Sequence, residues 1–308
     1  DSYETLTPEV LRRFHVVVVV GTPESSAGKS ATPAQLKAAA DFRDNLDAFS
    51  RAGGGVLWVP ISLQHGASAW NAAVGERIGV TALEEDLQDP TLQVDAGAVR
   101  RNHPLYAYLW TSDIAPHPVT ARVRGLLLPR LGEWSWPGTM PMRYGDDWTV
   151  LVKGMASTRS LGNAEAVGSG RKKFELPGTY TSEPEIIGAR EGADGAGRML
   201  VFPVYAAHTW LNFGHRAFND ALMLNGYGGR KSDGHRLLLN AYKWLGAPAV
   251  KAGGFGGYQP LPPITVTPAP IDWSAAAFPA GSWSGMSTFW NFRKQADTPM
   301  EQPTAARD

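Results

Sequence analysis

Side chains able to take part in catalysis follow three apolar segments of the sequence. The segments are Val16–Val20, 56–59 and 199–204, and the side chains that follow them are Glu24, Ser62, Gln64, His65 and His208. Carboxylate, hydroxyl and imidazole groups are the components of acid–base and nucleophilic catalysis, and a histidine also donates to sugar hydroxyls. These residue types predict one candidate site, with His208, Ser62 and Glu24 as catalytic candidates and Gln64 and His65 as ligand-binding candidates.

The combination of Ser62 and His208 as a hydrolytic pair has an alternative interpretation. A nucleophile on a strand-to-helix elbow needs small residues on both sides, and Pro60 and Gln64 occupy those positions. A polar loop residue that satisfies backbone groups is therefore the favoured role of Ser62. For His208 two roles stay open: an acid, base or sugar ligand in a site, or a buried histidine bonded to the backbone.

Tryptophan is frequent, with 11 residues in the chain, and indole faces stack on sugar rings. Trp210, which follows His208 closely, and Trp134 are the aromatic candidates for ligand binding. Trp134 also belongs to an aromatic and charged patch whose other members are Trp136, Arg143, Asp146 and Asp147. This patch is either a sugar-stacking surface or a solvated hairpin between strands, and the hairpin is favoured.

Other kinds of site find little support. Gly28-Lys29-Ser30 suggests a phosphate-binding loop, but Pro23 stands where that motif needs a glycine and offers no N–H. The seven histidines show no local metal-binding spacing, so neither a metal nor a cofactor is expected. There is no cysteine, which excludes disulfides, thiolate ligands and a cysteine nucleophile.

The elements that position the candidate residues follow from the hydrophobic pattern. Val16–Val20 lacks polar alternation, which is typical of a strand covered on both faces in a parallel sheet. A helix is expected from a capping box at Thr32 to the glycines 53–55, and the crossover rule then places the strand 56–59 parallel to Val16–Val20. Ligands bind beyond the carboxyl ends of such strands, where the candidate residues fall.

The remaining pattern completes the predicted organisation. Further strands are expected at 148–152, 185–189 and 199–204, and a last helix from Ser232 or Asp233 to Gly246. The predicted fold class is α/β, with a doubly wound, mostly parallel sheet flanked by helices in residues 1–246. Residues 247–308 are rich in Pro, Gly and Trp without helical period, so they form either an extended arm packed on the domain or a connector.

Several segments in this order resemble the class I glutamine amidotransferase-like fold, and most closely its ThuA-like (trehalose-utilisation) branch. They are residues 6–11 with 14–18, 49–56, His-Pro-Val-Thr at 117–120, 195–201 and 239–245. The resemblance implies a flavodoxin-like arrangement of strands and helices. ThuA-like sequences also place a His-Thr pair after the strand equivalent to 199–204, as His208-Thr209 do here.

Two departures from this family matter. The family opens with a strand before the first helix, whereas only residues 1–5 precede the first matching segment. We therefore expect a piece of a longer protein, with the sheet position beside Val16–Val20 either empty or filled by another segment, such as one from a partner chain. Amidotransferases of the family use a cysteine, so amidotransfer is not expected from a chain without one.

Charge and composition limit the partners. Lys and Arg together number 29, as do Asp and Glu, so no basic field favours nucleic acid or an anionic membrane surface. No segment approaches the roughly 20 apolar residues of a spanning helix. The absence of cysteine fits the cytosol and the periplasm equally, while the Trp and Gly content favours a periplasmic or extracellular bacterial protein.

Three functions follow. The leading one is a carbohydrate-associated accessory or ligand-binding domain of a larger bacterial protein, without amidotransferase activity. The alternative is a small hydrolase or lyase that acts on a sugar through His208 with Ser62 or Glu24. A structural domain that assembles other parts of a longer polypeptide, or a partner chain, is the third.

Overall fold

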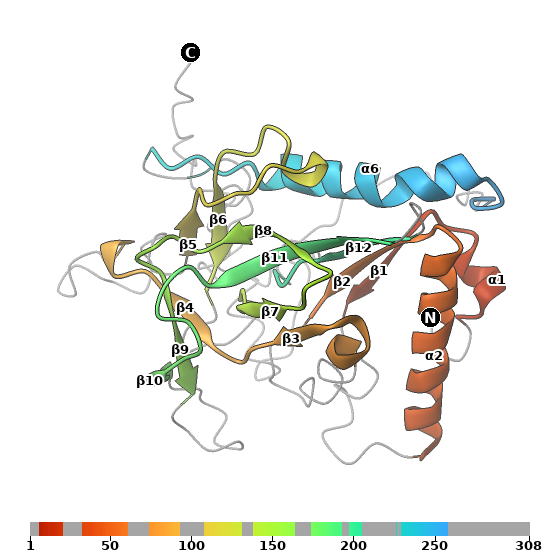
Figure 1. The fold of residues 1–308 in the computed structure, drawn as a ribbon, viewed down its shortest axis with the longest axis horizontal. Helices are drawn as coiled ribbons and strands as arrows, with labels where there is room; N and C mark the ends of the chain where they lie inside the picture. Colours follow the sequence, from red (N-terminus) through yellow and green to blue (C-terminus); the bar gives the residue numbers. More distant parts are fainter. Residues whose placement is uncertain are drawn as a thin grey trace, which may run out of the picture.

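The central feature of the fold is a five-stranded sheet. The computed structural model describes residues 6–20, 33–60, 74–92, 108–130, 138–163, 174–192, 197–204, 226 and 229–257. The sheet has the order β1 (Val16–Val20), β2 (Gly55–Val59), β12 (Arg198–Val201), β11 (Glu185–Glu191) and β8 (Thr149–Lys153) (Figure 1). β1, β2 and β12 are parallel neighbours, as predicted, whereas β11 is antiparallel to both β12 and β8.

The prediction of a doubly wound, mostly parallel sheet flanked by helices is wrong. Half of the pairings in the central sheet are antiparallel, and three small antiparallel sheets accompany it. These are β10 (Phe174–Pro177) with β9 (Arg159–Asn163) and β4 (Asp86–Gln88), β3 (Val80–Ala82) with β7 (Met142–Tyr144), and β5 (Tyr108–Thr111) with β6 (Leu126–Pro129). One physical reason is chain length: six residues join β11 to β12, and a parallel connection needs about a dozen or more.

Helices cover the two faces of the parallel strands. The described helices are α1 (Pro8–Leu11), α2 (Pro33–Arg51), a helical turn at 74–78 and α6 (Gly234–Ala252), with short 3-10 helices η3 (Pro90–Leu92) and η5 (Pro118–Thr120). Phe42 and Phe49 of α2 pack with Trp58 on one face of the sheet. Leu237 and Leu245 of α6 pack on the other, and Figure 1 shows α6 along that side. None of the described helices is long and apolar enough to cross a membrane.

The ends of the helices show how local sequence sets their length. Thr7 caps α1, as its hydroxyl accepts from the backbone N–H of Val10 at 3.4 Å. α6 continues to Ala252, so the predicted end at Gly246 is wrong. Pro248 lies inside it and offers no N–H to the carbonyl of Trp244, which instead accepts from Arg198 Nη1 at 2.8 Å. That external donor lets the helix pass its proline without an orphaned carbonyl.

β1 differs from the buried strand that its sequence predicts. Among the described residues it pairs with β2 alone, and Val18 is 37% exposed. β2, by contrast, is buried along all five residues. The run expected at 199–204 forms β12 as far as Val201, and Val204 makes one antiparallel bridge to Thr139. The strands expected at 148–152 and 185–189 are confirmed as β8, which is shifted by one residue to Thr149–Lys153, and β11.

Candidate functional site

The carboxyl ends of the three parallel strands lie side by side at one end of the sheet. Val20 lies opposite Val59, and Val201 lies opposite Trp58. The N–H of Phe202 donates to the carbonyl of Trp58 at 2.9 Å, which holds the end of β12 level with the end of β2. The chain therefore leaves the sheet at three adjacent points, beyond which ligands bind in sheets of this kind.

The predicted site residues lie beyond these points. Glu24, Ser62, Gln64, His65, His208, Trp210 and Trp134 are all outside the described residues, so their assignments stay predictions. What the described strands supply is spacing, since neighbouring strands are about 4.8 Å apart and β1 is two strands from β12. Ser62 follows Val59 by three residues and His208 follows Val204 by four. At roughly 3.3–3.6 Å per residue, these segments are long enough for their side chains to meet.

The charged residues of the predicted aromatic patch do not lie in a hairpin. Arg143, Asp146 and Asp147 are exposed and lie in or beside a turn between β7 and β8. These two strands pair with β3 and β11 respectively, so the hairpin interpretation is wrong. Asp147 forms an ion pair with Arg190 at 3.0 Å. Trp134 and Trp136 lie outside the described residues, so the sugar-stacking alternative stays untested.

A buried polar row, which the sequence analysis missed, continues from the end of β12. Val204 bridges Thr139, and Thr139 bridges Arg130. The Arg130 guanidinium forms an ion pair with Asp86 at 2.5 Å, and the Asp86 side chain is only 1% exposed. Gln88 Nε2 also donates to the Asp86 carboxylate at 3.3 Å. The row thus connects the central sheet to β4 through side chains 44 residues apart in sequence.

Two features make this row a candidate part of a site. A buried ion pair pays a desolvation cost that a purely structural contact could avoid with apolar residues. Thr139 is fully buried, and its hydroxyl has no hydrogen-bond partner among the described residues, although buried polar atoms are nearly always paired. No local sequence signal marks such a row, because its members share no motif or periodicity.

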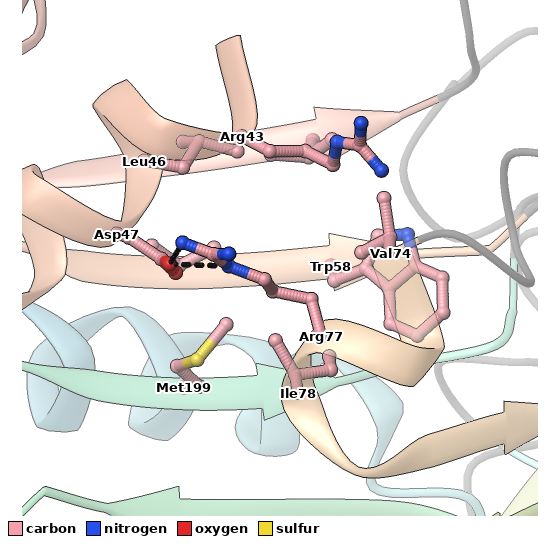
Figure 2. Close-up of a pocket in the computed structure, with 10 residues that line it drawn as sticks. Arg43, Leu46, Asp47, Trp58, Val74, Arg77, Ile78 and Met199 are labelled. Atoms are coloured by element: carbon pink, nitrogen blue, oxygen red, sulfur yellow. Dashed lines mark hydrogen bonds and ion pairs between the residues drawn. The ribbon is translucent and has the colours of Figure 1, made fainter. Parts of the chain in front are cut away.

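A cavity lies on the α2 face of the parallel strands (Figure 2). Its lining is mostly apolar and comes from β1, β2, β12, α2 and the helical turn at 74–78: Val19, Arg43, Leu46, Asp47, Val56, Trp58, Val74, Arg77, Ile78 and Met199. Arg77 bonds Asp47 at 2.6 Å and Asp44 at 3.2 Å across its rim. The volume of the cavity is about 30 Å³, enough for one or two water molecules. Ligand pockets measure about 300–1,000 Å³, so this cavity alone does not hold a sugar.

The described residues contain no group of three His, Asp or Glu side chains that could hold a metal ion. This finding applies only to the described part of the chain, and the expectation of no metal stays a prediction for the rest.

Two solved structures are similar to this chain at low sequence identity. No family model matches the chain, and no curated protein matches it. The N-terminal domain of mmIFT52 is similar over 80% of this chain and 82% of its own, with 13% identity and a TM-score of 0.47. A ThuA-like protein from Bacteroides uniformis is similar over 79% of this chain and 74% of its own, with 12% identity and a TM-score of 0.40. The second is ThuA-like, as the sequence segments suggest, and neither comparison shows a glutamine amidotransferase-like link. At such scores neither likeness carries an argument about function.

Proposed function

We propose that this chain is a carbohydrate-associated, ligand-binding domain without amidotransferase activity, and that its site lies beyond the carboxyl ends of β1, β2 and β12. The observation that carries the proposal is that the carboxyl ends of these three strands are in register. The segments after Val20, Val59 and Val204 therefore start from the same end of the sheet. Six of the seven predicted site residues, all except Trp134, follow those points within six residues.

The chemistry of the chain supports binding over amidotransfer. No cysteine is present in the sequence, so the thiol on which that reaction depends in the resembling family is missing. Tryptophan offers faces for sugar rings, while His208, Gln64 and His65 offer donors and acceptors for hydroxyl groups. We further propose that the domain works as an accessory part of a larger bacterial protein in the periplasm or outside the cell.

The test is calorimetric titration with a panel of neutral mono- and disaccharides that includes trehalose. A sugar that binds the unaltered protein should bind His208→Ala and Gln64→Ala at least ten times more weakly, with melting temperatures almost unchanged. Asp41→Ala serves as the matched control, because Asp41 is exposed on α2 and should leave affinity unchanged.

Other outcomes separate the alternatives. Release of a cleaved sugar, followed by proton NMR and lost in His208→Ala, would replace the binding proposal by the hydrolase or lyase. If no sugar of the panel binds, or if both variants bind as the unaltered protein does, the carbohydrate proposal is wrong. A large loss of stability in His208→Ala without loss of binding would make His208 a core residue.

A further inference from the structure

Within the described part of the chain, one edge of β1 has no partner strand, and the sequence of β1 favours pairing. It consists of five consecutive valines, and among the described residues only β2 pairs with it. Natural edge strands are protected by lysine, proline or a covering segment, since an apolar edge recruits other strands. β1 itself has neither lysine nor proline, and Val18 is 37% exposed. We therefore expect another segment to cover this edge.

We propose that residues 264–267 (Ile-Thr-Val-Thr) of the same chain add to this edge as a strand parallel to β1. The first argument is where the described chain leads. α6 ends at Ala252, and the N–H of Gly256 then donates to the carbonyl of Arg12 at 3.0 Å, while Phe255 packs edge-on against Phe49 with ring centroids 5.7 Å apart. Gly256 therefore lies beside the residues that lead into β1.

The path from this point has the right length and direction. Six residues, 258–263, separate Gly257 from Ile264 and span up to about 20 Å, whereas one strand spacing is about 4.8 Å. A strand that starts at the amino end of β1 and runs along it is parallel to β1. It also runs opposite to α6, whose residues Leu245 and Gly246 pack over the amino ends of β2 and β1.

The handedness of the connection from β12 through α6 to the proposed strand fits the rule for parallel strands. From β1 the chain crosses to β2 through α2 on one face of the sheet, and from β12 it returns through α6 on the opposite face. A strand beyond β1 would be reached by moving across the sheet in the reverse direction. Reversing both the direction and the face keeps the hand the same. If the crossover from β1 to β2 is right-handed, as the rule for parallel connections requires, the proposed crossover is therefore right-handed as well.

The sequence of the segment suits an edge position. Its four residues are all β-branched, and they alternate so that Ile264 and Val266 share one side. That side would cover Val18, which by alternation shares the α6 face with Val16. Pro268 follows directly, and a proline at the end of an outer strand stops a further strand from joining.

Disulfide trapping tests the pairing in the full chain, which has no cysteine of its own. Val18→Cys is combined with Ile264→Cys or Val266→Cys, and the matched controls combine it with Thr265→Cys or Thr267→Cys, which point to the other face. Cysteines on one face of neighbouring strands meet the distance that a disulfide requires. At least one of the first two pairs should form an intramolecular bond under mild oxidation, at least ten times faster than either control.

Three results would overturn the proposal: equal rates in all four pairs, no bond in any, or bonds only between two chains, which would put a second copy on this edge. Hydrogen exchange gives a second measurement that does not depend on the cysteine variants. Val266→Pro should raise the exchange rates of amides in β1 at least tenfold, whereas Ala276→Pro should not. Unchanged exchange in Val266→Pro would show that the segment does not pair with β1.

Discussion

The two halves of the central sheet are stabilised in different ways. In the parallel half, β2 is buried along its whole length, and its side chains alternate between the apolar clusters under α2 and α6. In the antiparallel half and the small sheets beside it, directional polar contacts recur. Tyr144 donates to the carbonyl of Ile186 at 2.8 Å, and Tyr180 donates to that of Met142 at 2.6 Å.

The contacts around β4 are polar and directional as well. Asp89 accepts from Ser157 at 2.9 Å, and Glu85 accepts from the backbone N–H of Thr179 at 2.9 Å. Apolar burial is non-directional and tolerates exchange of one hydrophobic residue for another of similar size. Buried polar contacts depend on both partners. The comparison therefore predicts where stability is most sensitive to mutation. In the antiparallel half it should depend most on single polar side chains, and in the parallel half on the close approach of one backbone to another.

The largest expected effect is that of Asp86→Ala. The change removes the carboxylate from a buried ion pair beside a guanidinium that is itself mostly buried, so we expect a loss of about 3–5 kcal/mol in the free energy of unfolding. Asp41→Ala is the control, because the Lys37–Asp41 pair is exposed and is worth no more than about 0.5 kcal/mol. Urea unfolding of both variants measures the difference. Similar small losses in the two would contradict a special role for polar contacts in this half.

Gly55→Ala should give the next largest effect, in the parallel half. A Cβ atom at Gly55 would lie 2.4 Å from the carbonyl oxygen of Leu245, so β2 and α6 would have to separate at a cost of about 1–3 kcal/mol. Gly246→Ala on α6 is the matched control. There the nearest atom is 3.5 Å away, and alanine should stabilise the helix by about 0.5–1 kcal/mol. Thermal unfolding that shows equal changes of one sign would rule out close helix–strand packing at Gly55.

The same comparison explains what the sequence could predict. β1, β2 and β12 were predictable as parallel neighbours because each is a continuous apolar run between punctuating residues. β3, β4 and β7 have three residues each, too short for a periodic signal, and their partners are distant in sequence. The missed small sheets and the missed Asp86–Arg130 pair have this common cause, whereas the antiparallel half of the central sheet follows from the short connection between β11 and β12. At the site, the strand ends were predictable, whereas the segments that hold the candidate side chains lie outside the described residues.

Segments that suggested the family have structural roles where they are described. Thr120 of the His-Pro-Val-Thr segment donates to the carbonyl of Ala115 at 2.6 Å, and Asn240 of α6 donates to that of Val119 at 3.1 Å. The His117 ring lies edge-on to Trp244 with centroids 5.0 Å apart. These contacts fasten η5 to α6. Residues that resemble a family motif therefore give no evidence here of a reaction.

His117 should produce a moderate pH dependence. Burial lowers its pKa from 6.5, and its Nδ1 accepts from the N–H of Val119 at 3.2 Å, which the protonated ring cannot do. Because the folded pKa lies below the unfolded one, this contribution to stability is complete above about pH 6.5 and falls as the pH drops below it. The melting temperature should decrease from pH 7 to pH 5. His117→Asn keeps an acceptor without a titrating ring, so its decrease should be smaller; an equal one would assign the effect elsewhere.

The smallest expected effect concerns Asp233, which joins the start of α6 to the turn before β6. Its carboxylate accepts from the backbone N–H of Arg124 at 2.9 Å and from Nε and Nη2 at 3.1 Å. The hydrogen bond from the Arg124 side chain lowers the pKa of Asp233 from 3.8. A lowered carboxyl pKa stabilises the fold above the unfolded pKa, and that contribution is lost as the pH falls through the folded value.

Asp233→Asn should therefore cost about 1 kcal/mol or less at pH 7, since the Arg124 guanidinium is exposed and screened by solvent. The difference in unfolding free energy between the variant and the unaltered protein should shrink below about pH 4, where the unaltered carboxyl also becomes neutral. It should also shrink in 1 M salt, because a surface ion pair is screened within about 3 Å there. Urea titrations at pH 7 and pH 3, and at pH 7 with and without 1 M salt, check both statements. A difference independent of pH and salt would mean that Asp233 acts by geometry alone, as the neutral contacts of the parallel half do.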